Sequence, residues 1–584
     1  MSSIPADDEP RLGDHSADRR MLLLAFMSLV VGTGGALGAW CLLKLIALAT
    51  NAFWFRQWTA GPSSILDAAH GMQTFFTPML GSLLVGLMAR YGSEKIRGHG
   101  IPEAIETILY GESRLSLKVA ILKPLSSAIS IGSGGPFGAE GPIIMTGGAI
   151  GSLFAQCFRL SAAERKTLLV AGAAAGMTAI FGTPLAAVLL ALEVLLFEWK
   201  PRSFVPVVVA AVVALIWRPM LIGAGPLFPF QAALPMGIWP FGAAAAIGVL
   251  IGLQSAALST LLYKIEDIFH RIPLHWMWWP ALGAVAVGIG ALIDPRVLGA
   301  GYENIQSLLD DSMAMRAILL LLAVKALVWL IALGSGTSGG VLAPLLIIGG
   351  ATGLAVGHQL PAGGGLWALL GMAGILSGAM RAPLTGAIFA AELTGRFDAL
   401  PYAVIASAAA YATSVLLIRR SILTEKIARR GRHIVQEYTV DPQDLLQAGD
   451  LMTPRPQTLS GAMTVGQAVR FFEEEAAHRA YPLVDEAGTL IGLVSRSDAL
   501  RWKQDGGIAC VSLAEHASDA SISIAFPQTP AGHVADLMVQ TGVGRVPIVE
   551  ARSRRLLGLL TRHDLLKARH AARRNEMREH SVMD

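Results

Sequence analysis

One carboxylate, Glu140, stands among glycines and prolines in the segment SGGPFGAEGP, residues 133–142. Proline is favoured in the first turn of a helix, so Pro142 indicates a helix that begins close to Glu140. The first turn of a helix has unpaired N–H groups and a positive dipole end, and both favour negative charge. An ionised acid here competes with a bound anion for the same donors. The segment therefore predicts an anion site with an acid at its edge.

Two further segments combine glycine and proline in the same way. They are GHGIP at residues 98–102 and GVLAP at residues 340–344. At membrane depth, irregular backbone is tolerated only where it is buried or lines a cavity. Three such breaks therefore predict a desolvated anion site built mainly from backbone amides. The alternative is that these glycines only allow close helix packing, which explains neither the prolines nor the acid.

The composition is typical of a polytopic membrane protein. Of 584 residues, 53% are hydrophobic and only 15% are charged, and the mean hydropathy is +0.55. Several apolar runs are long enough to cross about 30 Å of hydrocarbon. The first run follows a charged leader, residues 1–20, and is longer than the apolar part of a signal peptide, so we expect a retained membrane helix after a cytoplasmic segment. The runs cover residues 21–50, 77–88, 167–197, 204–222, 239–262, 276–293, 317–333 and 403–418.

The motifs of several catalytic and metal centres are missing. The three cysteines, Cys41, Cys157 and Cys510, have neither metal-ligand spacing nor a disulfide framework, and we expect them to be small core residues. The GxGxxG match at residues 334–339 follows a run of membrane length, which argues against a dinucleotide site. There is no Walker Gly-Lys and no His-Glu-x-x-His motif. We therefore expect no enzyme, no metal site, no required cofactor and no nucleic-acid partner.

The membrane part contains an internal repeat. GSGGPFGAEGPIIMTGG begins at Gly132 and GSGTSGGVLAPLLIIGG begins at Gly334, 202 residues later. GHGIPE at residue 98 corresponds to GAGYEN at residue 299, and Glu193 and Glu392 each follow a proline by nine residues. Two related halves with glycine-broken segments at matching positions are typical of a transporter fold whose site lies at the repeat interface. We expect a membrane domain over residues 21–432, with repeats of roughly 21–222 and 223–420.

A soluble region follows the membrane domain. Beyond residue 419 the apolar runs shrink to strand length, and the segments 481–500 and 546–566 share the order strand, turn, strand, then Ser/Thr-x-x-Asp at a helix start. This order indicates a duplicated soluble unit. Basic residues gather where the last apolar run ends, which predicts that the C-terminal tail is cytoplasmic. They are Arg419, Arg420, Lys426, Arg429, Arg430 and Arg432.

The three glycine-proline segments resemble those of the CLC chloride channels and proton-coupled chloride transporters. The family patterns G-S-G-I-P, G-[KR]-E-G-P and G-x-F-x-P appear here as GHGIP, GAEGP and GVLAP. The resemblance implies a polytopic α-helical membrane protein with an inverted-repeat CLC-type fold and broken helices. It also implies a homodimer with one pore per subunit, surrounded by lipid, and we expect it in the bacterial inner (cytoplasmic) membrane. A magnesium transporter or an intramembrane protease would need cation or metal motifs that are not evident here.

The soluble region is similar to the paired CBS domains of many CLC proteins. The resemblance implies a cytoplasmic α/β CBS pair. We expect the first CBS-like domain and its lead-in over residues 433–505 and the second over residues 506–570. A polar tail, residues 571–584, follows.

The resemblance also assigns the anion site. The family's gating glutamate falls on Glu140, and chloride is the expected ligand. His99 stands where a serine is common, Leu342 where a phenylalanine is usual and Leu423 where a tyrosine is usual, so side-chain coordination is weakened while backbone amides remain. His99 either donates a hydrogen bond to the anion or is a packed neutral histidine. The expected anion-binding residues are His99, Gly100, Ile101, Ala139, Gly141, Val341, Leu342 and Leu423.

One position bears on the choice between a channel and an exchanger. Proton-coupled members usually have a second glutamate directly after the residue that matches Glu193, and this chain has Val194 there. Valine cannot carry a proton, so the sequence favours passive anion conduction gated by Glu140. The alternative is a proton/chloride antiporter in which Glu198 or a water chain replaces the missing acid.

The tail contains two Ser/Thr-x-x-Asp elements, Ser495 with Asp498 and Thr561 with Asp564. They resemble the elements by which CBS domains hold the ribose of adenine nucleotides. The same pattern is an ordinary capping box at a helix N-terminus. An adenine nucleotide at the CBS pair and a purely structural role both stay open at this point.

Overall fold

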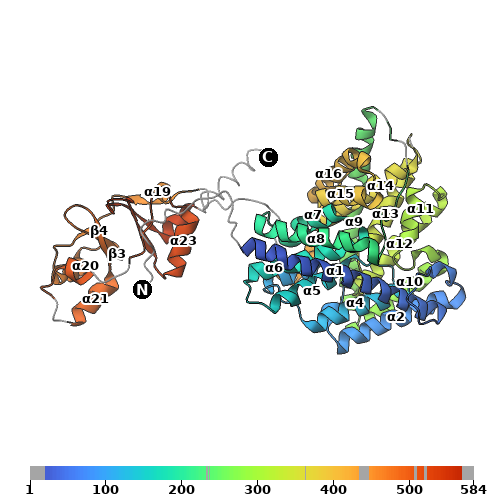
Figure 1. Ribbon diagram of the computed structural model, residues 1–584, viewed down its shortest axis with the longest axis horizontal. Coiled ribbons are helices and arrows are strands. Elements are labelled where there is room, and N and C mark those ends of the chain that lie inside the picture. Colours follow the sequence, from blue (N-terminus) through green and yellow to red (C-terminus); the bar gives the residue numbers. More distant parts are fainter. Residues whose placement is uncertain are drawn as a thin grey trace. The chain divides into compact units, whose positions relative to one another are not determined.

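The computed structural model describes residues 20–231, 234–235, 237–361, 363–432, 446–505, 509–517 and 522–568. The chain divides into two compact units (Figure 1). One lies within Asp14–Glu437 and is called the membrane unit here, and the other includes Tyr438–Asp584 and is called the tail unit. The predicted polar tail 571–584, nearly all of the leader 1–20 and the lead-in 433–445 lie outside the described residues.

The regular elements of the membrane unit are all helices in its described residues, and the first repeat runs through α8. Its helices are α1 (Arg20–Thr50), η1 (Asn51–Phe55), η2 (Ile65–Asp67), α2 (Gly71–Tyr91), η3 (Glu94–Ile96), α3 (Ile101–Tyr110), α4 (Leu117–Gly132), α5 (Glu140–Gln156), α6 (Ala162–Phe181), α7 (Pro184–Leu190), η4 (Ala191–Leu196) and α8 (Pro201–Leu221).

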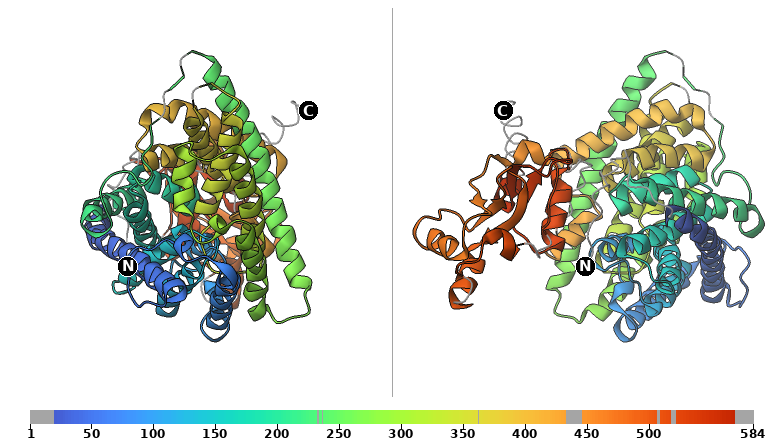
Figure 2. Two further views of the ribbon diagram at one scale, coloured as in Figure 1. Left: turned by 90° about the vertical axis from the view of Figure 1, so that its right-hand side faces the viewer. Right: turned by 60° about the vertical axis from the view of Figure 1, so that its left-hand side comes forward.

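The second repeat has the same helix order, and its α9 is the long green helix in Figure 2. Short broken helices again stand between long ones: α11 corresponds to α3, α13 to α5 and α15 to α7. The helices are α9 (Trp239–Arg271), η5 (Trp276–Trp278), α10 (Trp279–Ile293), η6 (Pro295–Val297), α11 (Tyr302–Leu309), α12 (Met315–Gly334), α13 (Leu342–Gly357), α14 (Gly364–Met380), α15 (Pro383–Thr394), η7 (Phe397–Ala399), α16 (Leu400–Leu417) and α17 (Thr424–Arg429).

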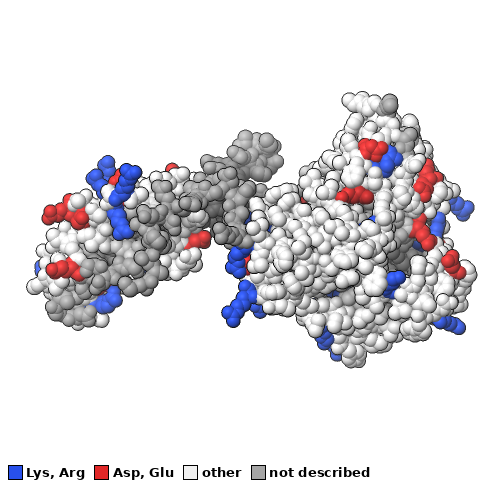
Figure 3. Space-filling view, in the orientation of Figure 1, with Lys and Arg blue, Asp and Glu red and all other residues white. Residues whose placement is uncertain are grey.

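Seven helices of the described residues are long and apolar enough to cross a membrane. The space-filling view agrees with this, since the visible face of the membrane unit is mostly uncharged (Figure 3). The spans are Arg20–Phe55, Gly71–Tyr91, Pro201–Leu221, Trp239–Arg271, Trp276–Ile293, Met315–Gly334 and Phe397–Leu417.

The apolar run 167–197 does not form one continuous helix. It is divided at Gly182, whose φ of +69° is left-handed, and a new helix begins at Pro184. Proline fits the first turn of α7, because its missing N–H would have no partner there.

The expectation that the three cysteines are core residues is wrong, since Cys41, Cys157 and Cys510 are all exposed.

Glycines allow the broken helices to pack closely on their neighbours. A Cβ atom at Gly172 of α6 would lie 2.1 Å from the carbonyl oxygen of Gly147 in α5. In the second repeat, a Cβ atom at Gly371 of α14 would lie 2.1 Å from the carbonyl oxygen of Gly349 in α13. Close packing therefore accounts for these glycines, which lie away from the helix starts.

The tail unit contains two small sheets, each built on an antiparallel hairpin, but the third strand differs: β2 pairs parallel with β3, whereas β1 pairs antiparallel with β6. One sheet has the order β2-β3-β4, and the other has the order β1-β6-β5. In β3–β4 and in β5–β6 the antiparallel register shifts at the equivalent place, between Leu483 and Val484 and between Ile548 and Val549. The predicted duplication is therefore present in the structure. The strands are β1 (Thr453–Pro454), β2 (Leu459–Ser460), β3 (Ala480–Val484), β4 (Leu490–Ser495), β5 (Arg545–Val549) and β6 (Leu556–Thr561).

Helices cover these sheets, and each sheet has its own hydrophobic cluster. The helices described in the tail unit are α19 (Ala448–Leu451), α20 (Val465–Glu474), α21 (Arg496–Asp505), α22 (Leu513–Ala517) and α23 (Ala531–Gln540).

Candidate anion site and gate

The two repeats meet at the starts of α5 and α13. Gly138 and Gly340 are equivalent residues of the repeats and form an antiparallel bridge. The N–H of Gly340 donates to the carbonyl of Gly138 at 2.9 Å, and the reverse bond measures 3.3 Å. The bridge holds the N-termini of α5 and α13, which begin at Glu140 and Leu342, next to each other.

The start of α3 lies against the same point. A Cβ atom at Gly141 would be 2.0 Å from the carbonyl oxygen of His99, so only glycine allows this approach. Gly100 has a φ of +89°, a conformation that also favours glycine. Three helix N-termini therefore converge, and their free N–H groups and dipoles make the place suitable for an anion. We call it the candidate anion site.

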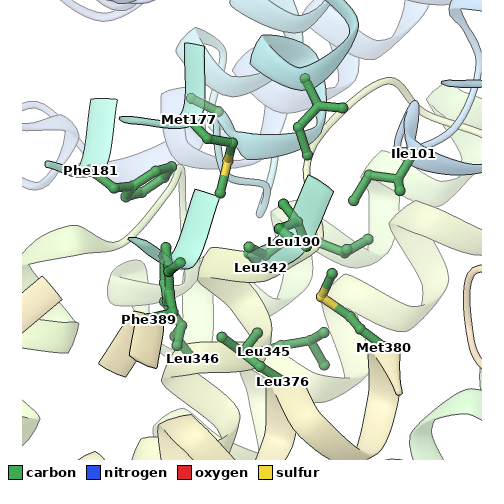
Figure 4. Packing of buried hydrophobic residues seen from close by; sticks show 14 of the residues in the cluster. Ile101, Met177, Phe181, Leu190, Leu342, Leu345, Leu346, Leu376, Met380 and Phe389 are labelled. Carbon is green, nitrogen blue, oxygen red and sulfur yellow. The ribbon is translucent and has the colours of Figure 1, made fainter. Parts of the chain in front are cut away.

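Apolar side chains of both repeats pack around this convergence. Figure 4 shows Ile101 and Leu190 of the first repeat in the same cluster as Leu342 and Met380 of the second. Ile101 and Leu342 are buried, at 0% and 2% exposure. The surroundings exclude water, which strengthens the interaction between a charge and the helix dipoles.

Glu140 places its carboxylate in the candidate anion site. The residue is 0% exposed. Its Oε2 atom faces Gly340, where it lies 2.6 Å from the position of an added Cβ atom. The N–H groups of Glu140 itself and of Ala343 are within reach of the carboxylate, but neither oxygen has a hydrogen bond of standard geometry. The Glu140 carboxyl group thus occupies the space between the helix N-termini, where the backbone amides could hold an anion.

A side chain that the sequence analysis missed lies beside this carboxylate. The Tyr302 hydroxyl, at the start of α11, lies close to Glu140, although the two groups make no hydrogen bond of standard geometry. The repeat in the sequence could have indicated this residue, because Tyr302 of GAGYEN occupies the place of Ile101 in GHGIPE.

Two buried lysines that the sequence analysis also missed hold the loops before α3 and α11. The ammonium of Lys123 donates to the carbonyls of Ile96 and Gly98 at 2.8 and 2.7 Å. In the second repeat, Lys325 donates to Val297 and Gly299 at 2.8 and 3.0 Å.

A further pair of equivalent residues caps helices of the opposite repeat. The carboxylate of Glu193 accepts hydrogen bonds from the N–H groups of Leu384 and Thr385, at 3.3 and 2.9 Å, at the start of α15. Glu392 accepts from Leu185 and Ala186, at 3.0 and 2.8 Å, at the start of α7. Each acid is therefore used as an N-terminal cap.

The next residue, Val194, lies in the apolar core. It is 1% exposed, and its segment η4 contacts α3. Glu198, the other acid considered for a proton path, accepts a hydrogen bond from Ser203 at 2.8 Å. It also lies 3.7 Å from both Lys166 and Lys200.

A cavity of about 790 Å³ opens beside the start of α3. His99 lines it, is 3% exposed and has a buried Nδ1 atom without a hydrogen-bond partner. Ion pairs join α17 to α3 here: Lys426 lies 2.8 Å from Glu103, and Arg430 lies 3.4 Å from the same carboxylate. The lining contains the basic residues Lys95, Arg97, His270, Lys426, Arg429, Arg430 and Arg432, and also the acids Glu94, Glu103, Glu106 and Glu266. Lysines and arginines outnumber the glutamates, and this excess of positive charge favours anions.

Leu423 and Leu342 supply no polar side chain. Leu423 stands immediately before α17 and is 0% exposed. Its N–H donates to the Ser421 hydroxyl at 3.3 Å, so this amide is already used. Of the predicted anion-binding residues, the structure brings together those around the starts of α3, α5 and α13. That Leu423 belongs to the anion-binding residues stays a prediction. The residues that meet are His99, Gly100, Ile101, Ala139, Gly141, Val341 and Leu342.

In the tail unit, both predicted nucleotide-binding elements form capping boxes. Asp498 accepts from the N–H of Ser495 at 2.9 Å, and its own N–H donates to the Ser495 hydroxyl at 3.3 Å. Asp564 and Thr561 make the same two bonds, at 2.9 and 3.3 Å. The arrangement satisfies helix N–H groups, and nucleotide binding stays a prediction.

Comparison with known proteins gives two sequence matches. Residues 80–415, more than half of the chain, match the family described as voltage gated chloride channel, and residues 448–505 and 521–571 each match the CBS domain. The voltage-gated ClC-type chloride channel ClcB of Escherichia coli O17:K52:H18 (strain UMN026 / ExPEC) is 32% identical over 386 residues, which cover 63% of this chain and 91% of that protein.

Solved structures show the same fold at lower identity. A slow cyanobacterial Cl⁻/H⁺ antiporter is 23% identical with a TM-score of 0.62, and the match covers 71% of this chain and 99% of the antiporter chain. A eukaryotic CLC transporter is 20% identical with a TM-score of 0.59, and the match covers 93% of this chain and 98% of that chain. The sequence matches and the broken-helix fold agree: the chain belongs to the CLC chloride channel and transporter family and carries two C-terminal CBS domains.

Proposed function

We propose that the protein is a chloride channel of the CLC type, in which passive conduction is gated by Glu140. As a CLC-family anion transporter it is a multi-pass membrane protein and not an enzyme. The observation that carries the proposal is the buried Glu140 carboxylate between the starts of α5 and α13, where the amides would otherwise hold an anion.

The ionised carboxylate closes the path because it occupies the anion's place. A charged side chain at membrane depth costs roughly 2.5–3.5 kcal/mol on insertion scales. A helix N-terminus returns up to about 2 kcal/mol in partly buried geometry, and two N-termini meet here, so the two terms are of similar size. A small change, such as protonation of Glu140 or arrival of an anion, is then enough to release the side chain.

The anion reaches this gate through the basic cavity beside α3. The lysines and arginines of its lining outnumber the glutamates, and this excess of positive charge raises the local anion concentration. His99 lies in this lining with an unpartnered ring nitrogen, which makes it the side-chain donor of the path in place of a serine. The amides at the starts of α3, α5 and α13 complete the coordination.

Val194 and the preceding residue, Glu193, favour channel function over proton/chloride antiport. Val194 cannot carry a proton, and the carboxylate of Glu193 is held by the N–H groups of α15. Glu198 is engaged with Ser203 and close to two lysines, which argues against a substitute relay. The curated relative in Escherichia coli is named a voltage-gated chloride channel. The solved structures named as antiporters are below 25% identical, so they support the fold and not the coupling.

CLC proteins are typically dimeric. We propose that each subunit holds its own pore and that the CBS pair lies in the cytoplasm. Because the contacts of the family's subunits lie in the membrane domain, a truncation after residue 432 should still run as a dimer in mild detergent. A monomeric truncation would contradict this proposal.

Proton coupling is tested in liposomes. Wild-type protein in vesicles loaded with chloride should release chloride once potassium permeability is supplied by valinomycin, and the external pH should stay constant. Glu140→Gln vesicles and empty vesicles serve as controls. Chloride-driven proton movement against its gradient in the wild type, absent in Glu140→Gln, would establish antiport instead.

A further inference from the structure

Three buried oxygen atoms around the gate lack a hydrogen bond of standard geometry. They are both carboxylate oxygens of Glu140 and the hydroxyl of Tyr302. The hydroxyl and the carboxylate lie close enough to interact with each other. A buried polar atom without a hydrogen-bond partner costs free energy of folding. A hydroxyl donor beside a carboxylate acceptor is therefore expected to have a function that involves both groups.

The second repeat fixes the position of Tyr302. The residue begins α11, directly after Gly301, whose φ is +71°. The loop before it is held by Lys325, and the N–H of Gly299 donates to the carbonyl of Gly134 at 3.1 Å. The Tyr302 ring packs on Phe228 with 5.8 Å between ring centroids. The phenol is thus held in place next to the loop that leads to the gate.

The tyrosine hydroxyl that is usual in the family is missing at Leu423, which is apolar and buried, and His99 stands in place of the usual serine. The equivalent of Tyr302 in the first repeat is Ile101, which is also apolar. Within the part of the chain that the structure describes, Tyr302 supplies the side-chain hydroxyl that interacts with Glu140.

Charged groups on the neighbouring elements have other partners. Lys123 on α4 donates to the carbonyls of Ile96 and Gly98, and Lys325 on α12 donates to those of Val297 and Gly299. The charges near His99, on the loop before α3, are those of Glu103, Lys426 and Lys123. From α13, the N–H of Ala343 faces Glu140. The carboxylate therefore responds to backbone amides and to one phenol.

We propose that Tyr302 is a gating residue, whose hydroxyl donates to the ionised Glu140 carboxylate and holds it in the closed position. This inference rests on the proposed gate at Glu140. When Glu140 is protonated or displaced, the bond is lost and the side chain leaves the anion path. The second repeat thus controls an acid that the first repeat carries.

The test is the pH dependence of chloride flux from liposomes containing Tyr302→Phe, which removes the hydroxyl and keeps the ring on Phe228. Loss of a donor destabilises the ionised carboxylate, so Glu140 takes up its proton at higher pH. The pH of half-maximal flux should move upward by about one unit, as expected for a hydrogen bond to a charged group. Tyr402→Phe is the control, because its hydroxyl donates to the carbonyl of Pro235 at 3.2 Å and it should leave the midpoint unchanged.

Two further variants distinguish a wrong role for Tyr302 from a wrong gate assignment at Glu140. Tyr302→Ile, which installs the residue of the equivalent first-repeat position, should shift the midpoint in the same direction and replaces Tyr302→Phe if that variant does not fold. An unchanged midpoint in the folded variant, while Glu140→Gln abolishes the pH dependence, would overturn the role of Tyr302 alone. Persistent pH dependence in Glu140→Gln would instead overturn the gate itself.

Discussion

The two repeats of the membrane unit share a scaffold but differ in chemistry. In both, a buried lysine holds the loop before a short broken helix, and an acid caps a helix of the other repeat. At the bridge of Gly138 and Gly340, however, the first repeat continues into Glu140 and the second into Leu342. Tyr302 of the second repeat replaces Ile101 of the first.

This difference distinguishes the residues that stabilise the structure of the site from the residues to which we assign gating. Residues that satisfy buried backbone groups recur at nearly the same offset, since both halves need them to stabilise irregular backbone at membrane depth. The two groups to which we assign gating, Glu140 and Tyr302, each occur in one repeat only. The comparison therefore predicts symmetric effects for scaffold substitutions and asymmetric effects for gate substitutions.

The largest effect is expected from Glu140→Gln. The amide keeps the shape of the side chain but removes its charge, so chloride flux should continue without pH-dependent gating. Flux measured from liposomes across acidic to neutral pH checks this. Leu342→Met at the equivalent position of the second repeat is the control and should retain the pH dependence. Full pH dependence in Glu140→Gln would contradict the assigned gate.

The two scaffold lysines should have similar effects on stability. Lys123→Met and Lys325→Met each leave at least two buried carbonyls unpaired, and each unpaired group costs about 1–3 kcal/mol. Thermal unfolding in detergent should show comparable losses of about 2–5 kcal/mol for both variants. Lys118→Met, at an exposed position of the same helix α4, should be close to neutral. A large loss for only one lysine would break the symmetry of the scaffold.

A smaller and again symmetric effect is expected from the reciprocal caps. Glu193→Ala exposes the N–H groups at the start of α15, and Glu392→Ala does the same for α7. Loss of an N-terminal cap costs about 0.5–2 kcal/mol, so both variants should unfold slightly earlier than the wild type. The pH dependence of flux should be unchanged in Glu193→Ala. A shifted pH profile would show that this acid takes part in gating after all.

The smallest effect is expected in the tail unit. Asp498→Ala and Asp564→Ala each remove one capping box, at a cost of about 0.5–2 kcal/mol. Thermal unfolding of the full-length protein should show a small loss of similar size for the two variants. If ATP raises the unfolding temperature of the wild type and not of either variant, the aspartates also bind nucleotide, and the purely structural role is wrong.

Much of this architecture was predictable from local sequence signals. The glycine-proline breaks at residues 98–102, 138–142 and 340–344 mark helix starts, because proline fits the first turn and glycine allows close approach. The repeat follows from matching segments at nearly the same offset, and the duplicated tail follows from two segments with the same order of elements.

Other features depend on contacts between residues distant in sequence. Lys123, Lys325 and Tyr302 stand in segments whose polar role is visible only when loops from the other elements are placed beside them. The exposure of Cys41 and Cys157 was mispredicted, because apolar surroundings in sequence do not distinguish a protein core from a surface that faces lipid.

The reversal potential of the wild-type protein in a planar bilayer tests the central claim most directly. With a tenfold chloride gradient and equal pH on both sides, passive chloride conduction predicts a reversal potential of roughly 59 mV in magnitude, the value for a single charge. An imposed pH gradient should leave this potential unchanged if, as we propose, Val194 interrupts the proton path. A reversal potential displaced from the chloride value that moves with the pH gradient would show proton coupling and contradict the channel.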